Sequence, residues 1–270
     1  MRYYFPIICF FQILLVSTFS FGQESIVEQA THNDSLPLRI EELLMISELW
    51  INDEENDEVI IIDGESQIGV SDYFSLSEIS WSDFEIGQKN ATNFLIRDTS
   101  KIKKKNGVIQ LICKNGVKKY IDHIPNSNDY DENIQTYEYV GSIPILNAYV
   151  ILGIYWEEFE YILIDKTTGE EIASFNEIPY ISPDKTHIIS ITSSPYGMNS
   201  ELSYYSITDM KIKPIVTMQF TNWMAADYSS YLYWGNDGSF YVGVNSIANF
   251  WDKNGETNLP KQFIKFTRNN

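Results

Sequence analysis

The feature that most constrains this chain is a unit that recurs from residue 104 onward. Each copy reads as a tight turn, an apolar strand, a second turn and another strand that ends in aspartate. The closing residues are 43, 44 and 43 positions apart, and they are Asp122, Asp165, Asp209 and Asp252. A fixed period of this size is typical of a repeat architecture. The sequence therefore predicts hairpins at about 107–122, 147–165, 186–209 and 239–252.

The turns inside the unit use residues that favour a sharp reversal of the chain. Asn115-Gly116 lies between two β-like runs, and both residue types tolerate positive φ. Residues 180–192, YISPDKTHIISIT, place a Pro-Asp turn directly before a run of β-branched residues. An aspartate at a strand end accepts hydrogen bonds from the backbone of the turn that follows, which explains its place in the unit.

A further strand is predicted after each closing aspartate, and residues 211–220, KIKPIVTMQF, are the clearest case. Apolar residues alternate there with mostly polar ones, the period of a half-buried strand. Because Pro214 has no N–H to donate, we expect this strand at a sheet edge. Residues 93–98 are the candidate for the missing first strand of the first unit.

The fold prediction is all-β, with repeated four-stranded antiparallel meanders in a propeller-like arrangement of about four blades. An open sheet or a β-sandwich built from the same hairpins is the alternative. Burial is expected to be highest in the central strands of the units, at Ile109, Leu111, Val150, Ile189, Ile191 and Val242.

Several stretches resemble blades of known repeat families. NFWDKNGE and ILIDKTTGEE resemble the end of the third strand in WD-repeat blades, and ISPDKTHIISI resembles the Ser-Pro-Asp turn of bacterial periplasmic propellers. The similarity covers residues 90–268 in outline, and the Gly-His pair of WD repeats is absent. The arrangement is also similar to small secreted bacterial proteins of unassigned activity. The resemblance implies a propeller-like architecture and no particular activity.

The first 22 residues have the layout of a secretory signal peptide, with Arg2, an apolar run and small residues before Gln23. The apolar run is shorter than the roughly 20 residues that span a bilayer. We therefore expect a secreted or periplasmic protein without membrane insertion after signal removal. In residues 23–50 we expect a polar segment and then a short helix, because Ile40, Leu43, Leu44, Ser47 and Trp50 follow helical spacing. Residues 51–270 then form a single β domain, with repeats from about residue 90.

Charge and cysteine content exclude several classes of protein. The net charge of −18 opposes binding to nucleic acid, whose phosphates are also negative. Loss of the signal peptide removes Cys9 and leaves Cys113 alone, so no intramolecular disulfide is expected. No cysteines and histidines stand at zinc spacing, and no nucleophile elbow or phosphate-binding glycine loop is present. The sequence predicts no cofactor and no metal site.

Two classes of function remain. The preferred one is a secreted, non-enzymatic binding or interaction module with a protein or carbohydrate partner. The alternative is a hydrolase whose carboxylates converge from several blades and therefore form no local motif. Glu157 and Glu158, next to Trp156, do not form an acid–base pair by themselves, because adjacent strand residues point to opposite faces, and we interpret them as the charged tip of a hairpin turn. In a propeller the loops between second and third strands line one rim. The candidate binding residues on that rim are Asn115, Trp156, Glu157, Glu158, Tyr196 and Asn245.

Overall fold

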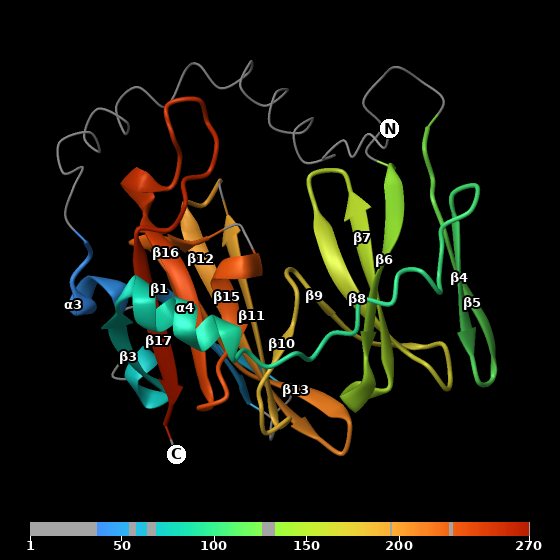
Figure 1. The fold of residues 1–270 in the computed structure, drawn as a ribbon, viewed down its shortest axis with the longest axis horizontal. Coiled ribbons are helices and arrows are strands. Elements are labelled where there is room, and N and C mark those ends of the chain that lie inside the picture. The colour runs from blue at the N-terminus through green and yellow to red at the C-terminus, as the bar shows by residue number, and fades with distance from the viewer. Residues whose placement is uncertain are drawn as a thin grey trace.

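The computed structural model describes residues 37–53, 58–63, 69–125, 133–194, 196–226 and 229–269. Within these ranges the chain is mostly β, and all strand pairs are antiparallel. The strands form several sheets, none of them closed into a barrel or ring (Figure 1). The all-β prediction is confirmed. The signal peptide lies outside the described residues and stays a prediction.

The largest sheet, the six-stranded sheet, joins strands near the N-terminus to strands from residues 180–220. Its order is β10 (Tyr180–Ile181), β11 (His187–Ser194), β12 (Asn199–Thr208), β13 (Lys211–Phe220), β1 (Ile46–Asp53) and β2 (Glu58–Asp63). Consecutive strands β10 to β13 form a meander, and the N-terminal hairpin β1–β2 is added beside β13.

The five-stranded sheet packs against one face of the six-stranded sheet. Its members are β14 (Trp223–Ala225), β15 (Leu232–Trp234), β16 (Ser239–Ser246), β17 (Gln262–Arg268) and β3 (Phe74–Ile79). Helix α4 (Trp81–Lys89) covers its outer face, where Phe84 packs with Tyr233, Tyr241 and Phe263. Ser80 begins this helix by accepting a hydrogen bond from the Asp83 N–H.

Two further sheets hold the first two repeat units. The four-stranded sheet contains β6 (Gln135–Ile143), β7 (Ala148–Tyr155), β8 (Phe159–Asp165) and β9 (Glu171–Phe175). The two-stranded sheet is the hairpin of β4 (Val108–Cys113) and β5 (Gly116–Ile121). The remaining elements are α3 (Ile40–Leu43) and the 3-10 turns η1 (Val70–Asp72), η2 (Pro144–Leu146), η3 (Ser229–Tyr231) and η4 (Ile247–Asn249). None of the helices in the described ranges is long and apolar enough to cross a membrane.

Two apolar clusters hold the sheets together. The larger one joins the six-, five- and four-stranded sheets, and Phe220 contacts both Trp223 and Phe266 in it. The smaller one packs the β4–β5 hairpin, including Cys113, onto the four-stranded sheet. All six residues expected to be most buried are confirmed, since none is more than 1% exposed: Ile109, Leu111, Val150, Ile189, Ile191 and Val242.

Three of the four predicted hairpins are present as β4–β5, β7–β8 and β11–β12. The turn aspartates also act as expected in two places. The carboxylate of Asp165 accepts hydrogen bonds from the Thr167 and Thr168 N–H groups, and that of Asp252 accepts from Asn254 and Glu256.

The fourth predicted hairpin, at 239–252, is wrong in its second strand. Strand β16 forms, but residues 247–249 form η4, and Trp251 makes only an isolated bridge to Thr257. The reason is that both edges of β16 are already filled, by β17 on one side and by β14 and β15 on the other. Residues 247–252 therefore have no place in the sheet and begin a loop.

The N-terminal helix is correct only for Ile40–Leu43, because residues 46–53 form strand β1. This strand lies between β13, which is about 170 residues away in the sequence, and β2, which directly follows it. Its backbone is satisfied by ladders on both sides, and Leu49 is fully buried against the core. Long-range pairing therefore outweighs the local helical spacing.

The expected edge position of β13 is also wrong, since it lies between β12 and β1. Pro214 is tolerated because β1 pairs with β13 only from Val216 onward, and the β12–β13 register shifts beside it. The chain is thus locally unpaired on one side at the proline. Residues 93–98 do not form the expected strand either, because only Ile96 bridges to another residue, Ser142 of β6.

Candidate functional site

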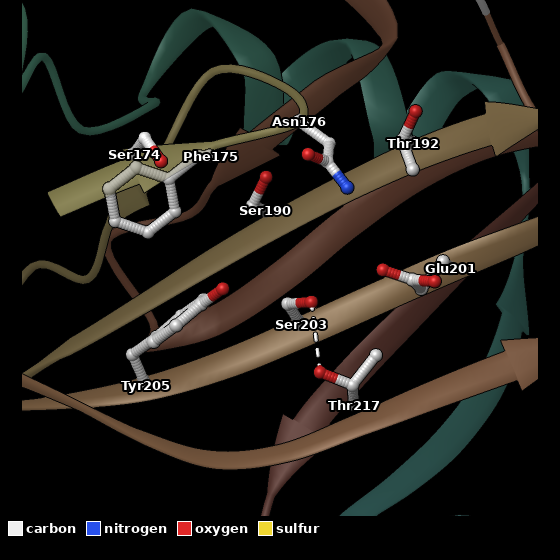
Figure 2. A pocket seen from close by; sticks show the side chains of 9 residues that line it. All are labelled: Ser174, Phe175, Asn176, Ser190, Thr192, Glu201, Ser203, Tyr205 and Thr217. Atoms are coloured by element: carbon white, nitrogen blue, oxygen red, sulfur yellow. Dashed lines mark hydrogen bonds between the residues drawn. The ribbon is translucent and has the colours of Figure 1, made fainter. Parts of the chain in front are cut away.

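A polar groove of about 240 Å³ lies on the face of the six-stranded sheet that is turned toward β9. Figure 2 shows side chains of β11, β12 and β13 on one side of it, with β9 and the residue that follows it beyond. The groove is lined by Ser174, Phe175, Asn176, Ser190, Thr192, Glu201, Ser203, Tyr205 and Thr217. Hydroxyl and amide groups dominate this lining, and it contains a single carboxylate.

The sheet register explains why these side chains share one face. Ser203 of β12 stands opposite Ser190 of β11 and Thr217 of β13, and its hydroxyl lies 3.0 Å from that of Thr217. One row further along, Glu201 stands opposite Thr192 and Gln219. Directly opposed residues in an antiparallel sheet point to the same side, so the rows form one polar surface.

Glu201 is the only charged residue that lines the groove. It is half-buried and makes no ion pair with a lysine or arginine among the residues that the structure describes. Burial raises the pKa of its carboxyl group, because the charged form loses solvation without gaining a partner. Its oxygens are therefore available to accept hydrogen bonds from a bound molecule.

Two aromatic rings close one end of the groove. The buried Phe175 of β9 meets Tyr205 of β12 edge-on, with 5.1 Å between ring centroids. Burial raises the pKa of Tyr205, so its hydroxyl stays protonated at neutral pH. Beyond the groove, Trp50 of β1 stands opposite Thr217 and continues the same face with an aromatic ring.

A second cluster, at the turn before β11, connects two sheets. Asp184 forms an ion pair of 2.8 Å with Arg268 of β17, and the same guanidinium hydrogen-bonds to Nδ1 of His187. Burial acts to raise the pKa of Asp184, but hydrogen bonds from Ser182 and Arg268 outweigh it and the pKa lies below its usual value. Burial and the neighbouring arginine lower the pKa of His187, which stacks on Tyr204. The cluster fastens the five-stranded sheet to the six-stranded one.

The six residues predicted from the sequence do not gather on one rim. Asn115, in the β4–β5 turn, donates its N–H to the carbonyl of Thr167, which follows β8. Trp156, Glu157 and Glu158 form the β7–β8 turn, at the opposite end of β8. A strand of seven residues, about 20 Å, separates the two places.

The other two predicted residues lie on different sheets. Tyr196 is in the β11–β12 turn and is 62% exposed. Asn245 of β16 is buried, and its side chain bonds to the backbone of Asn258, Leu259 and Lys261. Asn245 therefore shapes the loop before β17 and is not available at a surface.

The groove residues were missed because nothing marks them locally in the sequence. The only signal is the polar half of the alternation in β12 and β13, which places Glu201, Ser203 and Thr217 on the side away from the core. That signal is shared by any half-exposed strand. In the described part of the chain no three histidine, cysteine or acidic side chains are grouped as metal ligands.

Comparison with known proteins adds no family to this description. No protein-family model matches the chain, and neither a curated protein nor a solved structure matches it. The groove must therefore be interpreted from its own chemistry.

Proposed function

We propose that this protein is an exported, non-enzymatic binding module whose polar groove holds a small, neutral, polyhydroxylated ligand such as a saccharide unit. The observation that carries the proposal is the lining of the groove, in which hydroxyl groups and one amide surround a carboxylate that makes no ion pair with any described residue. Export rests on the signal-like residues 1–22.

The lining matches the chemistry of a polyol. Each serine, threonine and tyrosine hydroxyl both donates and accepts, as each ligand hydroxyl does. Glu201 accepts only, and an ionised acceptor makes hydrogen bonds that are stronger than neutral ones. The volume is below the roughly 300–1,000 Å³ of drug-sized pockets, which favours one ring rather than a long chain fully enclosed. The flat faces of Tyr205 and Trp50 suit the apolar face of such a ring.

The hydrolase alternative is not favoured by this site. Glycoside hydrolysis requires two carboxyl groups on either side of the bond that breaks. Only Glu201 supplies one among the residues lining the groove. A single acceptor in a row of hydroxyls supports binding better than acid–base chemistry.

The propeller-like arrangement belongs to the same proposal. The three hairpins that form as expected enter three successive sheets, and apolar clusters join neighbouring sheets face to face. This order supports degenerate blades around an open arc. The groove then lies between two neighbouring blades, at a place where polar side chains of the two blades face each other instead of apolar ones.

Calorimetry with a panel of neutral mono- and disaccharides tests the proposal. We expect at least one to bind, and the double variant Ser203→Ala/Thr217→Ala to weaken that binding by about tenfold or more, since two hydroxyl contacts at roughly 1 kcal/mol each are lost. Ser77→Ala, an exposed serine of β3 on another sheet, is the matched control and should bind like the parent protein. Binding that survives the double variant unchanged would place the ligand elsewhere and contradict the proposal.

A further inference from the structure

Among the residues that the structure describes, two strands on different sheets have one edge without a neighbouring strand, and their sequences carry opposite charge. β5 is a strand of the two-stranded sheet, and β2 ends the six-stranded sheet. Both have six residues, GVKKYI with two lysines in β5 and EVIIID with two acidic residues in β2. We propose that β5 of one copy pairs edge to edge with β2 of a second copy of this chain. This inference is independent of the proposed ligand groove.

The backbone of β5 is available for such pairing. The two-residue turn makes Cys113 and Gly116 a hydrogen-bonded pair, and bonded and non-bonded pairs then alternate along the hairpin. Val117, Lys119 and Ile121 therefore direct their N–H and C=O groups outward. Within the described residues no backbone hydrogen bond reaches these outward groups, so the edge is free as far as Ile121. Beyond that point β6 occupies the same edge, because His123 and Gln135 exchange backbone hydrogen bonds. The edge of β4 is partly occupied as well, because Tyr149 donates its hydroxyl proton to the Ile112 carbonyl.

Apolar side chains accompany both free edges. On the outer face of the hairpin Val117 is 52% exposed and Ile121 is 60% exposed, and in β2 Ile61 is 63% exposed. Exposed β-branched residues on an edge strand are the usual template for addition of another strand. Joining the two edges would cover these residues and satisfy the free backbone groups together.

Along the sequence, charge is segregated into the stretches that contain these two strands. Residues 97–119 contain eight lysines and arginines and one acidic residue, in a chain whose net charge is −18. Residues 52–63 contain six acidic residues and no basic one. Lys119 makes no ion pair among the described residues, so its charge is free to act on a partner.

Charge also selects which edges are compatible. Pairing β5 with β5 brings lysines together, and pairing β2 with β2 brings carboxylates together, so both are disfavoured. Only the unlike pair is attractive. Two copies that make the contact reciprocally form a closed dimer, and copies that make it in one direction form an open chain. The competing explanation is that the lysines only block the edge, as edge lysines do in many sheets.

The first test is the molar mass of the purified protein by light scattering over a 100-fold range of concentration, at about 50 mM and about 500 mM salt. We expect the weight-average mass to rise above that of one chain with concentration at low salt. High salt should reduce the rise because it screens the charges. A mass that stays at one chain under all conditions means that the charges only block the edges, and it overturns the proposal.

Charge reversal then tests the strands themselves. Lys118→Glu/Lys119→Glu and Glu58→Lys/Asp63→Lys should each remain monomeric alone, whereas an equimolar mixture should associate again, because every unlike contact is restored in it. In the β1–β2 register Glu58 pairs with Asp53 and Asp63 pairs with Glu48, so each substitution to lysine replaces a like-charged pair with an unlike one. Lys253→Glu, an exposed lysine in the 252–256 turn, is the control and should associate like the parent. Folded variants whose mixture stays monomeric, or a control that dissociates as fully, would exclude this pairing.

Discussion

The two faces of the six-stranded sheet are made by the same strands and have opposite character. On one face Leu49, Leu202, Met218 and Phe220 are fully buried against the five-stranded sheet. On the other, the residues between them in sequence are half-exposed and mostly polar, and they line the groove. Period-two alternation separates the two sets. The comparison teaches that one face fixes the fold and leaves the other face free to carry a site.

Truncation of a core side chain should have the largest effect on stability, and it tests whether only one face of the sheet fixes the fold. Phe220→Ala should lower the free energy of unfolding by about 3–5 kcal/mol, because it removes a fully buried ring that packs on Trp223 and Phe266. Thr217→Ala, three residues earlier on the polar face, should cost about 1 kcal/mol or less. Urea denaturation measures both. Equal losses would show that the polar face is also part of the core.

The ion pair between the sheets should have an intermediate effect. Asp184→Ala should lower the free energy of unfolding by about 1–2 kcal/mol near neutral pH, since a partly exposed charged hydrogen bond to Arg268 is lost. Because the folded-state pKa of Asp184 is lowered, its contribution is present above the unfolded value near 3.9 and is lost as pH falls through the folded value.

The difference in Tm between Asp184→Ala and the parent protein should therefore become smaller as the pH is lowered from 7 to 2. Glu78→Ala, which changes an exposed acidic residue of β3, is the control and should melt like the parent. A difference that is constant with pH would assign the effect of Asp184 to packing instead of charge.

The smallest effect, and one of opposite sign, is expected at Glu201. Its folded-state pKa is raised, so the folded chain binds more protons than the unfolded chain above the ordinary glutamate pKa, and stability falls as pH rises through that window. Glu201→Gln should therefore raise stability at pH 7, by less than about 1 kcal/mol or about 2 °C in Tm.

The advantage of Glu201→Gln should disappear below about pH 4, where the parent carboxyl is protonated in both states. Calorimetry at several pH values measures it, with Glu78→Gln as the matched exposed control. A loss of stability at pH 7 would show that the Glu201 carboxylate has a stabilising partner in the folded protein.

Local chemistry predicted the hairpins well. Asn115-Gly116 and Pro183-Asp184 favour chain reversal through their own conformational preferences, and the β-branched runs beside them favour extended backbone. The same signals failed where a place in a sheet was already filled. Residues 247–252 end in an aspartate like their counterparts, but the edges of β16 are occupied.

The groove could not be predicted in the same way. Glu201 and Thr217 come from separate strands, and Phe175 comes from another sheet altogether. Their proximity depends on the β11–β12–β13 register and on how the four-stranded sheet packs. The six residues proposed from the sequence were chosen by assuming a closed ring, and they are dispersed because the sheets do not share one rim.

The sequence by itself determined the all-β class, three hairpins and the most buried positions, because turns and alternation depend on neighbours within about ten residues. Only the tertiary structure decided that residues 46–53 join β13 as a strand, that Pro214 lies inside a sheet, and which polar side chains meet in the groove. These outcomes depend on contacts between residues far apart in the chain. Their free energy becomes available only when several sheets have already packed together.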